Sequence, residues 1–168
     1  MKNDPRSPAS EYDLRYQVDL QVKLYEGARE AWDGYQQVSS VRAILADILK
    51  VEPVAELADA TTSFDSKLAL IGGSGGGGRR FGGGFPPAGG TQPAPTFAGV
   101  MGAMIRHLGT LDSGDMAPNE VMIKNAKTAL ADLKTATANW KTLAEKDLAA
   151  FNIVLAKFKI KPIMDALR

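Results

Sequence analysis

Residues 72–95 read GGSGGGGRRFGGGFPPAGGTQPAP, and this run stands between two stretches whose apolar residues recur at helical spacing. Glycine loses the most backbone freedom on ordering and proline lacks an amide donor, so the run favours neither helix nor strand. We expect a disordered loop here, with the flanking helices folding against each other across it. The sequence therefore predicts an all-α helical bundle interrupted by a Gly/Pro-rich insertion.

The first helix is predicted to begin near Ser10 and to run to Glu52-Pro53. Ser10 suits an N-cap, Glu11 and Asp13 follow in the first turn, and a residue before proline avoids the helical conformation. Helical spacing gives this segment two apolar stripes, which predicts two packing neighbours. The first stripe is Leu14, Val18, Val22, Tyr25, Trp32 and Tyr35, and the second is Leu20, Leu24, Ala31, Val38, Val41, Leu45 and Ile48.

Three further helices are predicted over residues 54–71, 97–111 and 120–158, with Gly72 stopping the first and Pro118 opening the last. Two short helices in series match one long helix, so we expect an antiparallel bundle of two long and two short helices. A compact four-helix bundle with bent long helices is the alternative. The side chains expected inside are Leu57, Ala60, Phe64, Leu68, Ile71, Phe97, Val100, Met101, Met104, Ile105, Leu108, Leu111, Met122, Ala126, Ala129, Leu133, Trp140, Leu143, Leu148, Phe151, Leu155 and Phe158.

The composition bounds the domain organisation and the partners. The 168 residues predict one domain, with residues 1–9 extended, residues 10–168 forming the bundle and a flexible insertion at 72–95. The 20 Lys and Arg nearly balance the 19 Asp and Glu, and the net charge of +1 disfavours non-specific binding to nucleic acid or anionic lipid. Cysteine is absent, which excludes disulfides, thiolate zinc sites and thiol catalysis. We expect no membrane span, and the start lacks the apolar stretch of a secretory signal.

No catalytic residue, metal ligand or cofactor is predicted from the residues. His107 is the single histidine and lacks a partner at triad or metal-site spacing, so we expect a packing or surface role. The glycine run lacks the Lys-Ser or Lys-Thr of a phosphate-binding loop, and no strand precedes it. Trp32 and Trp140 are predicted to anchor the core, and Lys141, Lys146, Lys157, Lys159 and Lys161 to form a solvated face.

The insertion holds the candidate partner-binding residues. Arginine and aromatic side chains spaced by glycine resemble RNA-binding RGG segments. Two arginines offer few phosphate contacts, so weak RNA binding at most is expected, and a flexible surface loop is the favoured interpretation. The candidate residues of this loop, for a protein partner or RNA, are Arg79, Arg80, Phe81 and Phe85.

Motifs at both ends of the chain carry a family resemblance. At the start stand Lys2-Asn3-Asp4-Pro5-Arg6, Asp13-Leu14, Gln17 and Ser40-Val41-Arg42. Towards the end stand Ala117-Pro118-Asn119, Trp140 and Asp147-Leu148-Ala149-Ala150-Phe151-Asn152. Together these motifs resemble the C-terminal helical region of large bacterial exported proteins with BNR-repeat, sortilin-like β-propellers, often labelled glycosyl hydrolases. The resemblance brackets the chain but leaves out the Gly/Pro-rich loop.

The resemblance implies a context rather than a reaction. It implies a non-catalytic accessory domain that packs on, or mediates contacts for, a β-propeller of the same precursor or of another protein, in the periplasm or outside the cell. The Asp-box signature of such propellers, Ser-x-Asp-x-Gly-x-Thr-Trp, is absent from these residues, so no catalytic residue is carried over. The alternative is a free-standing helical interaction module that presents the Gly/Arg/Phe loop to a partner or to RNA. Oligomeric state is left open.

Overall fold

The computed structural model describes residues 9–51, 54–73, 94–112 and 117–163. Its regular elements are all helical: α1 (Glu11–Val51), α2 (Ala55–Gly72), α3 (Phe97–Leu111), α4 (Glu120–Leu143), η1 (Ala144–Leu148) and α5 (Ala149–Lys157). The predicted all-α class is confirmed, and the bounds of the predicted helices agree with those observed to within a few residues.

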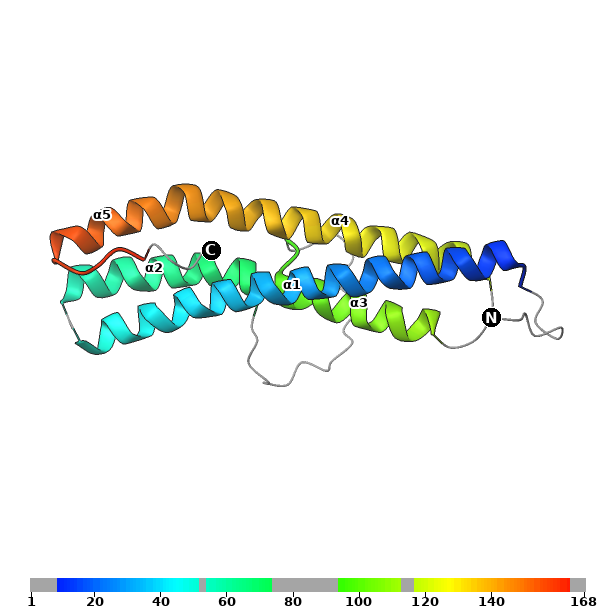
Figure 1. Ribbon diagram of the computed structural model, residues 1–168. Coiled ribbons are helices and arrows are strands. Elements are labelled where there is room, and N and C mark those ends of the chain that lie inside the picture. The colour runs from blue at the N-terminus through cyan, green and yellow to red at the C-terminus, as the bar shows by residue number, and fades with distance from the viewer. Residues whose placement is uncertain (1–8, 52–53, 74–93, 113–116, 164–168) are drawn as a thin grey trace, which may run out of the picture.

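Three helical rods lie side by side and form an elongated bundle (Figure 1). The first rod is α1, the second is α2 followed end to end by α3, and the third is α4, η1 and α5 in continuous succession. The middle rod runs antiparallel to the other two, and α1 packs most extensively against α3. The arrangement of two long and two short helices is therefore confirmed, in the three-rod form rather than the compact four-helix form.

Side-chain caps set where the helices begin. Ser10 Oγ accepts from the Asp13 amide, and the Ser10 amide donates to Asp13 Oδ2 at 3.0 Å, which forms a reciprocal capping box as predicted for Ser10. These hydrogen bonds from Ser10 lower the pKa of Asp13. Asn119 Oδ1 accepts from the Met122 amide at 2.9 Å and caps α4. Pro118 therefore lies before the helix and not at its first position, as had been predicted. Asn119 is the N-cap, because its side-chain oxygen accepts a hydrogen bond from a free amide of the first turn and a proline side chain cannot.

The core runs along the whole bundle between the three rods. On α2, the buried hydroxyl of Thr61 donates to the Leu57 carbonyl at 2.7 Å. The rings of Phe64 and Phe151 stack with their centroids 4.9 Å apart. The predicted interior is largely confirmed, although Ile105 is exposed and Ala60, Met101, Leu108, Met122 and Phe158 are half-buried. The fully buried side chains of greatest volume are Phe97, Leu24, Leu45, Leu57, Leu68, Met104, Leu155, Val38, Val41 and Thr61.

The third rod contains a π-helical turn, η1, that was not predicted from the sequence. Ala126, Leu133 and Trp140 are buried on α4 at intervals of seven residues. The next buried residue of this series is Leu148, eight residues after Trp140, and not Asp147. A π turn accommodates one extra residue, so it keeps Leu148 and Phe151 facing the core. Asp147 is left outward, where it pairs with Lys67 of α2.

Glycines let α1 lie unusually close to the middle rod. A Cβ at Gly34 would stand 2.5 Å from Cε1 and Cζ of the buried Phe97 ring, and a Cβ at Gly72 would stand 2.8 Å from Val38 Cγ1. Gly34 therefore buries the aromatic anchor at the start of α3 against the backbone of α1. Gly73, which ends α2, has a φ of 80°, a conformation that glycine adopts without strain.

Replacing Gly34 with alanine is predicted to destabilise the bundle by about 1–2 kcal/mol, because the steric cost of overpacking exceeds the roughly 1 kcal/mol gained in helix propensity. Gly102→Ala is the matched control, since its Cβ would meet nothing closer than an Arg106 guanidinium nitrogen at 3.4 Å. We expect Gly102→Ala to stabilise by about 0.5–1 kcal/mol. Urea unfolding followed by circular dichroism measures both, and equal effects of the two substitutions would contradict the close-approach argument.

Candidate functional site

The loop residues predicted to bind a partner, Arg79, Arg80, Phe81 and Phe85, lie outside the described residues. The predicted disorder of the insertion and the extended form of residues 1–8 also fall outside them. The surface features described below lie on the helices.

The most prominent surface feature is an apolar stripe on α1. Val18, Val22, Tyr25 and Trp32 are 55%, 49%, 58% and 46% exposed, and we call these four residues the α1 stripe. They belong to the first of the two predicted apolar faces, for which we expected a packing neighbour. That expectation was wrong, because α3 and α4 both pack on one side of α1 and bury the second face, which includes Leu24 and Val38. Leu14 and Tyr35 are half-buried at the margins of the stripe.

Trp32 and Trp140 differ in their surroundings. Trp140 is buried, as predicted, and its indole Nε1 donates to Gln37 Oε1 at 2.9 Å, which ties α4 to α1. Trp32 does not join it in the core. Its ring stacks on Tyr35 with centroids 5.7 Å apart while its own surface stays nearly half exposed. The stripe therefore ends in a paired aromatic platform that is open to solvent.

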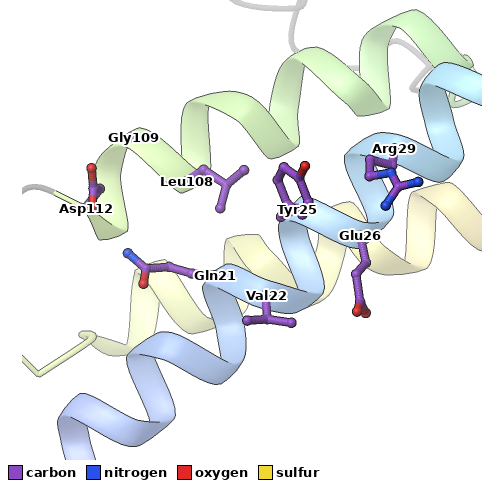
Figure 2. A pocket seen from close by; sticks show the side chains of 8 residues that line it. All are labelled: Gln21, Val22, Tyr25, Glu26, Arg29, Leu108, Gly109 and Asp112. Atoms are coloured by element: carbon purple, nitrogen blue, oxygen red, sulfur yellow. The ribbon is translucent and has the colours of Figure 1, made fainter.

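A groove runs beside the α1 stripe, between α1 and α3. Its volume is about 490 Å³, and its lining includes Val22, Tyr25 and Leu108 as apolar groups. Figure 2 shows Tyr25 and Leu108 in the space between the two helices, with Asp112 near one end and Arg29 near the other. The half-buried Leu108 extends the apolar surface of the stripe onto α3. The groove thus offers an apolar floor with polar ends.

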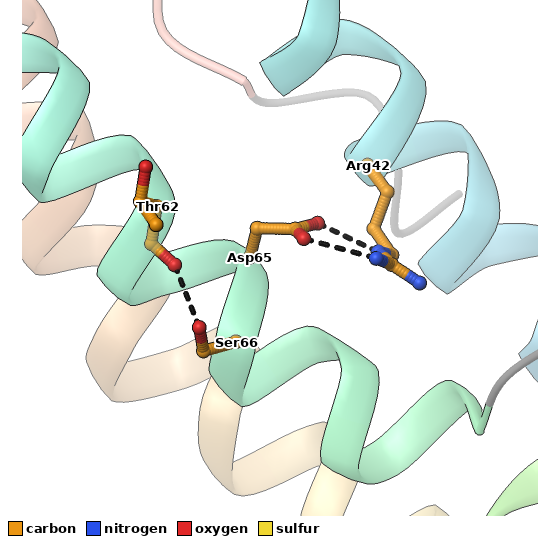
Figure 3. A network of polar contacts seen from close by, with 4 residues as sticks. All are labelled: Arg42, Thr62, Asp65 and Ser66. Carbon is orange, nitrogen blue, oxygen red and sulfur yellow. Dashed lines mark hydrogen bonds and ion pairs between the residues drawn. The ribbon is translucent and has the colours of Figure 1, made fainter.

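A second groove, of about 380 Å³, lies between α1 and α2 and contains an ion pair. Arg42 Nε and Nη2 donate to the two carboxylate oxygens of Asp65 at 2.6 and 2.9 Å (Figure 3). The Asp65 hydrogen bond is the main reason that the pKa of Arg42 is raised. Ser66, beside Asp65, donates to the Thr62 carbonyl at 2.9 Å within α2 (Figure 3). Since the guanidinium is already held in two bonds, this pair joins two helices rather than awaiting an anion.

His107 lies half-buried on α3, next to the groove residue Leu108. Burial lowers the pKa of His107 below its ordinary value of 6.5, and the charge of Arg106 lowers it further. Both effects favour the neutral imidazole. Among the described residues, no three His, Asp or Glu side chains are grouped so that they could hold a metal ion.

Within residues 9–51, 54–73, 94–112 and 117–163, no helix is both long and apolar enough to cross a bilayer. The chain was also compared with known proteins. No family model, no curated protein and no solved structure matches it.

Part of the site was visible in the sequence and part was not. The spacing of Val18, Val22, Tyr25 and Trp32 marked a helical face, but two faces of similar apolarity compete on the same helix. Nothing local shows which of them a neighbour covers. The groove was missed because Leu108 and Tyr25 come together only when α3 packs along α1.

The α1 stripe is predicted to contribute little to folding. Val22→Ser should change the free energy of unfolding by no more than about 0.5 kcal/mol, because an exposed substitution loses little buried contact. Leu24→Ala, two residues away on the fully buried face, should cost about 2–5 kcal/mol. Chemical denaturation of the two variants checks this. A comparable loss in Val22→Ser would mean that the stripe is covered in solution by part of this chain.

Proposed function

We propose that this chain is a non-catalytic helical accessory or interaction domain, and that it binds a protein partner through the α1 stripe. The observation that carries the proposal is the continuous exposure of two valines, a tyrosine and a tryptophan along one face of α1, beside a groove of about 490 Å³. Single exposed apolar residues are common on protein surfaces, but a contiguous set next to a groove is typical of an interaction site.

The chemistry of the stripe also supports a binding role. Tyrosine, tryptophan and arginine supply most of the energetically dominant contacts at protein interfaces. Tyr25, Arg29 and Trp32 follow one another at helical spacing on the exposed face, and Trp32 is already oriented by its stacking on Tyr35. An aromatic side chain fixed before binding loses less entropy when the partner arrives. These residues are the expected centre of the interface.

The resemblance supplies the proposed partner class, a β-propeller of the same precursor or of another exported protein, working in the periplasm or outside the cell. The residues that carry the resemblance have structural tasks in this fold. Trp140 ties α4 to α1, Asp147 pairs with Lys67, and Asn152 Oδ1 accepts from the Ile163 amide at 2.8 Å. These contacts hold the chain's own helices together, and the partner class rests on the resemblance alone.

The experiment uses the full chain as bait in an extract of its source cells, with quantitative mass spectrometry of what it retains. We expect the wild type to enrich a partner, and the triple variant Val22→Ser/Tyr25→Ser/Trp32→Ser to retain it at least ten-fold less, a change of about 1.4 kcal/mol. The matched control carries Leu70→Ser, a substitution at a side chain that is 72% exposed on α2, and should bind as the wild type does.

A deletion of residues 74–93 tests the alternative function, in which the Gly/Arg/Phe loop binds a protein or RNA. Our proposal expects the deletion variant to keep the partner. Loss of the partner on deletion, together with normal binding by the stripe variant, would overturn the proposal in favour of the loop. Enrichment of a propeller protein by the wild type, lost in the stripe variant, would support the proposed partner class.

A further inference from the structure

We propose that the groove between α1 and α3 accepts an amphipathic helix of the partner, and that this helix carries lysine or arginine along the flank that meets α1. This inference rests on the proposed function, because it specifies what the α1 stripe binds. The juxtaposition behind it is a largely apolar seam on α1, beside the groove between α1 and α3, with a line of exposed carboxylates along one border of the seam.

The spacing of the seam favours a helical occupant. Val18, Val22, Tyr25, Arg29 and Trp32 follow one another at alternating intervals of four and three residues, the spacing at which one helix packs along another. From Val18 to Trp32 the seam covers about 21 Å, or two heptads. A peptide that binds as an added β-strand would need the open edge of a sheet, and the described part of this chain is helical.

The second wall of the groove strengthens this argument. Leu108 of α3 lies across from Tyr25 of α1, and Val22 also lines the groove, so apolar surface from two neighbouring helices meets there. A helix that settles into such a groove packs against both walls, as a fourth helix does in a four-helix bundle. The partner would complete that arrangement along the half of the bundle formed by α1, α3 and α4.

The charges beside the seam favour basic side chains on the facing flank of the partner helix. Asp19, Glu26 and Asp33 repeat at seven-residue intervals beside the seam, and we call them the acidic column. All three are exposed, and none forms an ion pair with another described residue. The opposite border of the seam is formed by Gln21, Ala28 and Tyr35, none of which is an Asp, Glu, Lys or Arg. In paired helices, flanking charges of this kind select the partner and its orientation.

The acidic column has cationic neighbours within the chain. On α1 itself, Lys23 lies four residues after Asp19 and Arg29 lies three residues after Glu26, and neither forms an ion pair with the column. α4 packs along α1 and carries Lys127, Lys134 and Lys141 at the same seven-residue spacing, all of them exposed. None of these lysines pairs with the acidic column, and Lys141 instead approaches Glu145 at 4.0 Å. Exposed ion pairs contribute between 0 and about 1 kcal/mol each, so such pairing would not prevent a cationic helix from competing. The experiment separates the two roles.

A second copy of this chain fits the groove poorly. Two α1 seams packed antiparallel would set one acidic column against the other, and packed in parallel they would set it against uncharged side chains. The lysine-bearing helix α4 cannot supply the apolar seam, because Val121 is its exposed large hydrophobic side chain. An anionic bilayer would be repelled by the same carboxylates. A basic amphipathic helix of another protein satisfies both the seam and the flank.

The test measures fluorescence anisotropy of labelled designed peptides of about three heptads, titrated with the full chain. Two peptides share a leucine/isoleucine seam, one with lysine on the flank and one with glutamate, and a scrambled lysine peptide is the composition control. We expect the lysine-flank peptide to bind at least ten-fold more tightly than the glutamate-flank peptide at low salt, and the difference to shrink at high salt. Asp19→Lys/Glu26→Lys/Asp33→Lys should reverse this preference.

Four results would overturn the inference. They are equal binding of the two flank peptides, binding of the scrambled peptide, a stoichiometric dimer in sedimentation, and preference for anionic vesicles over peptide. A fifth result would show that the acidic column stabilises the fold instead of binding a partner. In that case the triple lysine variant of the column would have a lower melting temperature, and Lys127→Glu/Lys134→Glu/Lys141→Glu would restore it.

The failures of the two proposals are distinguishable. If the stripe variant loses the captured partner and neither flank peptide binds, the helical occupant is wrong and the proposed function stands. If the partner is retained by the stripe variant, the proposed function fails, whatever the peptides do.

Discussion

The contact between Gly34 and the Phe97 ring governs the geometry of the rest of the bundle. Because residue 34 has no side chain, Phe97 lies directly against the backbone of α1 at the point where α3 begins. That contact fixes how closely α3 runs beside α1, and so places Leu108 next to Tyr25 along the groove. A bulkier residue at position 34 would separate the helices and change the width of the groove. Stability and the candidate site thus depend on the same missing methyl group.

Helix number, order and approximate bounds followed from the sequence because they depend on local signals. Ser10 provides a capping oxygen, glycines end α2, and apolar periodicity marks each segment. The π turn at Ala144–Leu148 was not predicted, although the sequence holds its cause in the eight-residue step from Trp140 to Leu148. Such a step is resolved either by a π turn or by rotation of the helix, and the neighbours decide between them. Here the π turn goes with the Lys67–Asp147 ion pair and with the stacking of Phe151 on Phe64.

The sequence predicted the apolar face of the candidate site but not its exposure, because exposure depends on how the helices pack. Two apolar faces on α1 implied two neighbours, yet the faces are offset around the helix and the other two rods bury only one of them. Trp32 was expected in the core because tryptophan buries so much apolar surface. Its exposure beside Tyr35 is therefore informative, since the fold gains little from an indole ring that stays 46% exposed.

An apolar face that contributes little to folding still needs protection from self-association. The acidic column acts against it, because antiparallel pairing of two α1 helices through the stripe would bring Asp19, Glu26 and Asp33 of both copies together, with Arg29 as the single cation of each seam. The same carboxylates would attract a basic helix. One row of charges can therefore disfavour the homotypic contact and favour the heterotypic one, which gives α1 a core face for stability and an outer face for recognition.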